Sequence, residues 1–229
     1  MPLSDVRFDT PPFRYSGRVY GVLHNDRAAL AALGAAVDAA PYRGAPRAPV
    51  LYVKPRNTLR GPDAPVRVPP GGELEVGAGV GLVIGRSACA VRAEDALAHV
   101  AGANIVVDLS VPHAQWYRPQ ISAKARDGSC VLGTEVVPRP ALGEIGALRV
   151  RVLVDGELVH EHQRVDWVRD PARLLADVTD FMTLEPGDVL IAGIAHGAPR
   201  VKAGRRVTIE VEHLGRLELR TVAAEQAAA

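Results

Sequence analysis

The sequence is poor in cysteine and has no excess of charge of either sign. It holds two cysteines, Cys89 and Cys130, among 229 residues. So few thiols, far apart in the sequence, favour a reducing compartment over a scaffold built from disulfides. Basic residues number 27 and acidic residues 26, which gives a formal net charge of +1, and the basic residues form no run. Such a charge distribution attracts neither nucleic acid nor an anionic membrane.

Long apolar segments are also missing. A membrane-spanning helix needs about 20 consecutive, mainly apolar residues, and no segment approaches that length. The opening stretch MPLSDVRFDTPPFRY has neither the basic start nor the apolar stretch of a secretion signal. We therefore expect a cytoplasmic protein.

What the sequence does contain is a globular composition with many short strand patterns. Hydrophobic residues make up 48% and charged residues 23% of the chain, as in packed domains. Apolar runs predict strands that include 50–53 and 104–110, and alternation predicts a hairpin with an Asp155-Gly156 turn. Three modest helices are expected, at 26–39, at 92–103 and in a segment that opens on Asp170-Pro171.

The order of these elements indicates the fold class. The chain has no alternation of strands and helices at the βαβ spacing and no internal repeat. We therefore predict a β-rich α+β fold in one domain. The domain is expected over residues 15–222, between an N-terminal tail at 1–14 and a C-terminal tail at 223–229.

An unusual strand runs through EVGAGVGLVIGR, residues 75–86. Residues two apart on a strand point to the same face, so Gly77, Gly79 and Gly81 leave one face bare while apolar residues fill the other. Glycine weakens a strand interior unless something approaches closely. Another backbone packs on this face, or a space is left there, or functional side chains that once stood there are gone.

Asp108 is the most informative acid, because it lies inside the apolar run IVVDLS. A buried carboxylate must be paired, hydrogen-bonded or bound to a metal, since the cost of burying an isolated charge is too high. Asp108 is therefore either an ion-paired structural residue or a member of a metal or catalytic site.

Several charged residues suggest a place for an anion. Lys54 and Arg56 follow a predicted buried strand, and Arg118, Lys124 and Asp127 lie in a long polar loop. Cations at a strand end suit an anionic substrate, and arginine suits a carboxylate because its donors form a fork. Each residue alone is equally consistent with solvated surface charge.

Three histidines and two glutamates are weaker candidates. His160 and His162 share a strand face, but a zinc site needs at least one further ligand, so an exposed strand is expected. His196 lies in a glycine loop, from which its side chain can reach a site. Glu73 and Glu75 also share a strand face and are expected at a hydrated strand end.

The order of several segments resembles the fumarylacetoacetate hydrolase family over residues 15–222. These segments are YVKPRNT, GLVIGRSACAVRAEDALAHVAGA, VVDLS, KARDGSC, DGELV and LEPGDVLIAG. The resemblance implies a β-rich fold with a central rolled mixed sheet and few short helices. It also implies dimer-like pairing of two such domains, as a homodimer or with a sister subunit, and chemistry on 2-oxo diacids with Mg²⁺ or Mn²⁺.

The segments APVLYVKPRNTL, SVPHAQWYRP and KARDGSC are similar to family members of 4-hydroxyphenylacetate breakdown. The implied activity is decarboxylation of 5-carboxymethyl-2-oxo-hex-3-ene-1,7-dioate and isomerisation of its product, 2-hydroxyhepta-2,4-diene-1,7-dioate. One alternative is a degenerate, non-catalytic copy that completes a dimer with a metal-bearing sister. Another is a protein that binds dicarboxylates without chemistry.

The resemblance also implies a metal site, and here the sequence departs from the pattern. In the family a Glu-x-Glu strand and a later Asp hold a hard divalent cation. The later Asp matches Asp108, but the Glu-x-Glu positions are Gly77 and Gly79. Glu73 and Glu75 have the same spacing but lie four residues upstream, roughly 13 Å along a strand, which is too far to replace the missing ligands.

The remaining roles follow from the same resemblance. Lys124 and Asp127 match the catalytic positions, where a lysine supports developing negative charge. The residues expected to hold the substrate are Lys54, Arg56, Arg118 and His196. The Gly-Thr-Pro that the family places after the GDV strand is Gly193-Ile194-Ala195 here.

Overall fold

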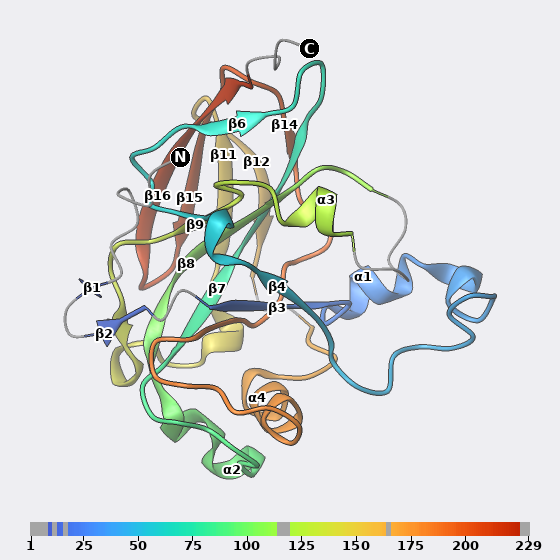
Figure 1. Ribbon diagram of the computed structural model, residues 1–229, viewed down its shortest axis with the longest axis vertical. Coiled ribbons are helices and arrows are strands. Elements are labelled where there is room, and N and C mark those ends of the chain that lie inside the picture. Colours follow the sequence, from blue (N-terminus) through green and yellow to red (C-terminus); the bar gives the residue numbers. More distant parts are fainter. Residues whose placement is uncertain (1–8, 11–12, 16–17, 114–119, 164–165, 225–229) are drawn as a thin grey trace.

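The computed structural model describes residues 9–10, 13–15, 18–113, 120–163 and 166–224 (Figure 1). Two sheets make up most of the described chain, with a separate two-stranded ribbon of β1 (Asp9–Thr10) and β2 (Phe13–Arg14). The larger sheet has nine strands, of which seven follow the order β4-β3-β13-β7-β8-β9-β5. Its strands are β3 (Val19–Leu23), β4 (Val50–Lys54), β5 (Leu59–Arg60), β7 (Leu74–Ile84), β8 (Val100–Ser110), β9 (Cys130–Leu132), β10 (Val137–Pro138), β13 (Val189–Ile191) and β14 (Arg200–Val201).

The second sheet has five strands in the order β12-β11-β15-β16-β6. They are β6 (Val66–Val68), β11 (Val150–Val154), β12 (Glu157–His162), β15 (Arg206–Val211) and β16 (Gly215–Ala223). Both sheets mix the two kinds of pairing, because β13 with β3, β5 with β9 and β16 with β6 are parallel and the other pairs are antiparallel. The predicted β-rich fold with a mixed central sheet is confirmed.

Helices are short and lie at the edges of the sheets (Figure 1). They are α1 (Arg27–Ala31), α2 (Ala93–Ala96), α3 (Ile121–Lys124) and α4 (Pro171–Thr179), with 3₁₀ turns at Gly34–Val37, Arg56–Thr58, Leu97–His99, Arg139–Ala141 and Ile145–Ala147. The helix predicted after Asp170-Pro171 is α4, whose Asp170 side chain accepts a hydrogen bond from the Arg173 N–H. No helix in the described ranges is long and apolar enough to cross a membrane.

The long strands β7 and β8 form the centre of the molecule. They pair antiparallel over almost their whole length, with Gly77 opposite Asp108 and Glu75 opposite Ser110. The even-numbered residues of β7 face the second sheet and belong to the main hydrophobic core, together with the apolar residues of β11, β15 and β16. The odd-numbered residues, which include the three glycines, face the opposite side.

Two helix predictions differ from the structure. The expected helix at 26–39 breaks into α1 and a 3₁₀ turn, because Gly34 takes a left-handed conformation with φ of +53°. The expected helix at 92–103 ends early, and β8 begins at Val100. Gly102 therefore lies inside β8. It allows the backbone of β10 to approach β8, since an added Cβ would collide with the Val137 carbonyl.

The glycine-lined face of β7 is not empty. A Cβ on Gly79 would lie 2.9 Å from the Gly193 carbonyl oxygen and 3.0 Å from Ile194 Cδ1. A Cβ on Gly77 would lie 2.9 Å from the Asp108 carbonyl oxygen and 3.1 Å from Ile194 Cγ2. The segment after β13 therefore packs on part of this face, so a backbone approaches it as the first of the three alternatives describes.

We predict that Gly81→Ala destabilises the fold. An added methyl group would overlap Val106, Asn104 and Val189, all of which are packed against β7 or β8. Overpacking of a well-packed interior costs about 1–3 kcal/mol. Chemical denaturation should show a loss of this size.

Gly72→Ala is the matched control, because its added Cβ would make only ordinary contacts of 3.4 Å with Pro69. Equal stability of the two variants would contradict the packing described for the glycine face.

Candidate functional site

A cavity of about 260 Å³ opens on the glycine-lined face of β7 and β8. One wall is polar and comes from β4, β7, β8 and α3, and the other is mainly apolar and comes from β3, α1 and the segment after β13. The polar lining residues are His24, Tyr52, Glu75, Asp108, Ser110, Lys124 and His196. The cavity therefore combines several titratable groups with an apolar wall, the usual composition of a small-molecule site.

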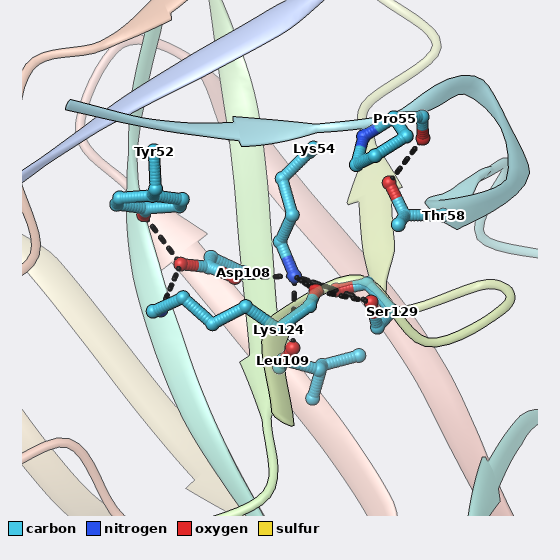
Figure 2. Close-up of polar contacts among 8 residues, drawn as sticks. All are labelled: Tyr52, Lys54, Pro55, Thr58, Asp108, Leu109, Lys124 and Ser129. Carbon is cyan, nitrogen blue, oxygen red and sulfur yellow. Dashed lines mark hydrogen bonds and ion pairs between the residues drawn. The ribbon is translucent and has the colours of Figure 1, made fainter. Parts of the chain in front are cut away.

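Asp108 lies at the base of this cavity and is held by three partners (Figure 2). Lys54 Nζ lies 2.7 Å from Oδ1, and Lys124 Nζ lies 3.0 Å from Oδ2. The Tyr52 hydroxyl donates to Oδ2 over 2.5 Å. Both carboxylate oxygens therefore already face a cationic or hydroxyl group.

Lys54 is a fully buried cation, with 0% of its side chain exposed. Besides the contact with Asp108, its ammonium donates to the carbonyls of Leu109, Lys124 and Ser129 over 2.6–3.1 Å and also lies 3.1 Å from Ser129 Oγ. Figure 2 shows these acceptors gathered around one nitrogen. The ammonium thus joins the end of β4 to β8 and to the segment between α3 and β9.

Lys124 faces the cavity with a different set of contacts. Its ammonium lies 4.3 Å from the centre of the Tyr52 ring, a cation–π contact, and donates to Asp108. Its side chain is 13% exposed, whereas Lys54 is sealed. Of the two lysines, Lys124 is the one placed to meet a ligand.

The charges of this cluster set the protonation states. Burial raises the pKa of Asp108, but the charges of Lys124 and Lys54 and the hydrogen bonds outweigh it, and the pKa falls to about 2. Burial and the neighbouring Asp108 carboxylate raise the pKa of the Tyr52 phenol well above its usual value. At neutral pH Asp108 is therefore an anion, and Tyr52 is a neutral donor to it.

The residues at this place do not fit a hard divalent cation. Such a cation takes six or more oxygen ligands, usually with several carboxylates. Gly77 and Gly79 supply none, and the Ile194 side chain lies against both. A metal at Asp108 would also lie next to the two ammonium groups that neutralise this carboxylate. Among the described residues no group of three His, Cys, Asp or Glu side chains is arranged to hold a metal ion.

The structure brings together some of the residues that the sequence singled out. Lys54, Lys124 and Asp108 meet, and His196 lines the same cavity while its backbone N–H donates to Asp26 over 2.7 Å. Asp108 is therefore ion-paired, which is one of the two alternatives that its apolar surroundings left open.

Other predicted residues lie apart from this cluster. Asp127 is exposed and accepts a hydrogen bond of 2.7 Å from the Asn57 side chain. Arg56 is exposed, and neither Asp127 nor Arg56 lines the cavity. Arg118 lies outside the described residues.

Three residues of the site were not assigned a role from the sequence. Tyr52 stands two residues before Lys54 on β4, so the alternation of a strand places both on one face. Glu75 shares the face of Gly77 for the same reason and lines the cavity, although a hydrated strand end was expected for it. Ile194 gave no signal, because its contact with β7 joins segments more than 100 residues apart.

The predicted exposed strand with His160 and His162 is β12, at the edge of the second sheet. Both histidines are half-buried, and their ring centres lie 5.6 Å apart. Burial, followed by the charge of His160, lowers the pKa of His162 to about 4. At neutral pH His162 is therefore uncharged.

Comparison with known proteins agrees with this architecture. A sequence model of the fumarylacetoacetate (FAA) hydrolase C-terminal family matches residues 18–222. The chain belongs to the fumarylacetoacetate hydrolase family. It is 35% identical over 202 residues to the 4-hydroxyphenylacetate degradation bifunctional isomerase/decarboxylase of Escherichia coli, and this match covers 88% of the chain but 46% of the relative. The chain thus spans about half the length of this curated relative.

Two further family members extend the comparison. A mitochondrial oxaloacetate tautomerase of Homo sapiens is 31% identical over 181 residues, which is 74% of this chain and 58% of the relative. Fumarylpyruvate hydrolase from Pseudomonas aeruginosa, solved with Mn²⁺ and pyruvate, has a TM-score of 0.79 at 23% identity and covers 98% of each chain. The fold is therefore that of the family, and family members bind a divalent metal with a small oxo acid.

We predict that Lys54→Met destabilises the protein strongly. The change leaves Asp108 buried beside one lysine instead of two and removes the ammonium that donates to three carbonyls. Removal of one partner from a buried ion pair costs about 3–5 kcal/mol. Urea denaturation should show this loss, while Lys202→Met, at a lysine whose side chain is 72% exposed, should stay within about 0.5 kcal/mol of the wild type. Similar stabilities for both variants would refute the structural role of Lys54.

We also predict that the chain alone binds no Mn²⁺ at its Asp108 site. Calorimetric titration with Mn²⁺, in the presence of oxalate as a mimic of an enolised 2-oxo acid, should give no stoichiometric heat. Micromolar binding that disappears in Asp108→Ala would show that a metal site exists and that the pairing with the two lysines is displaced.

Proposed function

We propose that the chain is one half of an isomerase/decarboxylase of aromatic catabolism. The substrates are 5-carboxymethyl-2-oxo-hex-3-ene-1,7-dioate and its decarboxylation product, 2-hydroxyhepta-2,4-diene-1,7-dioate. The metal-dependent decarboxylation belongs to a sister domain of the same family. This chain completes the assembly and offers a second cavity for the same dicarboxylates.

One observation supports this division of roles between the chain and its sister domain. Asp108 is paired with Lys54 and Lys124, and Ile194 packs on the neighbouring glycine face. Loss of CO₂ from a 2-oxo acid leaves an enolate that a chelated divalent cation stabilises. In this chain the corresponding place holds ammonium groups. A site of this kind attracts a carboxylate but offers no open coordination position.

The sequence relatives support the substrate class. The Escherichia coli relative is named as a bifunctional isomerase/decarboxylase, and this chain matches 46% of its length. A solved 5-carboxymethyl-2-hydroxymuconate delta-isomerase from Mycobacterium smegmatis is 28% identical, has a TM-score of 0.74 and is covered over 77% of its chain. A half-length match to a bifunctional relative suits a subunit that works with a second domain, as a heteromer.

Within this proposal the chain's own residues bind and orient the substrate. Lys124 meets one carboxylate or the 2-oxo group, because its ammonium is the exposed cation of the cavity. His196 and Ser110 line the same cavity and supply further polar contacts. The apolar wall near Ile194 and α1 receives the carbon chain and excludes water from it.

We predict that the chain alone does not decarboxylate 5-carboxymethyl-2-oxo-hex-3-ene-1,7-dioate, with or without Mn²⁺. Decarboxylation should appear when the chain is co-purified with a family member from the same organism that keeps the Glu-x-Glu and Asp ligands. Release of CO₂ and loss of substrate absorbance measure the reaction. The matched control is the sister chain with its first ligand changed from Glu to Gln, which should abolish the activity of the pair.

Mn²⁺-dependent decarboxylation by the chain alone, lost in Asp108→Ala, would overturn the proposed division of labour. Failure of every combination to turn over the substrate, with dicarboxylate binding retained, would favour a binding protein without chemistry.

A further inference from the structure

Glu75 is a carboxyl group of the cavity that the proposed function does not use. It stands on β7 opposite Ser110, two residue pairs beyond Gly77 and Asp108. Since alternate residues of a strand share a face, the Glu75 side chain lies on the same side of the sheet as Asp108. Both residues line the same cavity with Lys124.

The partners of the two carboxylates differ. Asp108 is held by two lysines and a tyrosine. Within the described residues the Glu75 carboxylate forms neither a hydrogen bond nor an ion pair, although it is half-buried. A carboxyl group that is partly desolvated and still accessible from a cavity is available to exchange a proton with a ligand.

The surroundings of Glu75 set its proton affinity. Burial is the largest influence and raises the pKa of Glu75, Asp108 on β8 raises it further, and Lys124, Arg200 and His196 lower it. These three residues lie on α3, on β14 and in the segment after β13. A pKa raised above the ordinary carboxyl value is the direction that suits a carboxyl group acting in general acid–base catalysis.

Lys124 supplies the complementary charge. An ammonium carries three donors, and in the described part of the chain Lys124 donates one hydrogen bond, to Asp108. The remaining donors are free for a ligand oxygen in the cavity. A fixed cation next to a developing enolate stabilises its negative charge in a site that excludes most water.

We propose that Glu75 transfers the proton in a metal-independent isomerisation of small 2-hydroxy-dienoic acids, with Lys124 stabilising the dienolate intermediate. This inference rests on the proposed function and assigns its isomerisation step to this chain. It adds a reaction site that uses a carboxyl group and an ammonium, in place of carboxylates and a metal.

The proposed step needs no other reactant. The Glu75 carboxylate takes the proton from the 2-hydroxyl group, so the O–H bond breaks and the C2–O bond becomes a carbonyl. The electron pair moves along the diene, which leaves one double bond between C3 and C4. C5 then takes the proton from Glu75 and forms the new C–H bond. Nothing is oxidised or reduced, and Glu75 returns to its starting state.

The test uses the full-length chain alone, in EDTA, with 2-hydroxyhepta-2,4-diene-1,7-dioate as substrate. The wild type should convert the diene to its 2-oxo-3-ene isomer, which is measured as a loss of diene absorbance. In D₂O it should also incorporate deuterium at C5. After subtraction of the uncatalysed rate, Glu75→Gln should isomerise the diene roughly 100-fold or more slower than the wild type. This is the usual contribution of a general acid–base group. Its binding of the inert analogue adipate, measured by calorimetry, should be retained.

Glu73→Gln is the matched control, because Glu73 has the same strand parity but does not line the cavity. It should keep the wild-type rate. Lys124→Met should lose both turnover and adipate binding. Circular dichroism checks that each variant is folded.

Absence of isomerisation by the folded wild type in EDTA would overturn the inference and leave the proposed function intact, because decarboxylation is tested separately with the sister chain. An unchanged rate in folded Glu75→Gln would also overturn it, by excluding Glu75 as the proton carrier.

Discussion

The buried ion pair between Lys54 and Asp108 is the interaction on which the site depends. The ammonium of Lys54 is fully buried, and its carbonyl acceptors belong to β8, to the last residue of α3 and to the segment between α3 and β9. A charge in this position is tolerable because a carboxylate and several carbonyl oxygens compensate the loss of water. The hydrogen bond from Lys54 to the Lys124 carbonyl also fixes the Lys124 backbone. It thereby positions the Lys124 ammonium at the cavity.

This arrangement changes the electrostatics that the family pattern implies. In the family pattern, three carboxylates surround one divalent cation. The charge of the metal compensates the negative charges that lie close together. In this chain one carboxylate, Asp108, is balanced by two lysines without any metal. The glycines at 77 and 79 then serve the packing of Gly193 and Ile194 against β7. In our proposal the chemistry of this cavity is hydrogen bonding and proton transfer in place of metal coordination.

The family fold separates the residues that stabilise the domain from the residues that face the site. The even-numbered residues of β7 hold the two sheets together in the main core, and the odd-numbered residues face the site. Because the two faces of a strand are independent in this sense, the site face can lose its ligands while the core face keeps the register with β8. Stability and chemistry are thus carried by alternate residues of one strand.

The sequence alone determined the strand-rich fold class, the bare face of β7, the Asp155-Gly156 hairpin and the burial of Asp108. Each of these depends on local periodicity or on the cost of burying a charge, which can be evaluated along the chain. Only the tertiary structure decided that Asp108 is neutralised by Lys54 and Lys124, that Ile194 packs on the glycine face and that Glu75 lines the cavity. These contacts join segments far apart in the sequence, and no local pattern encodes which distant side chain will fill a given space.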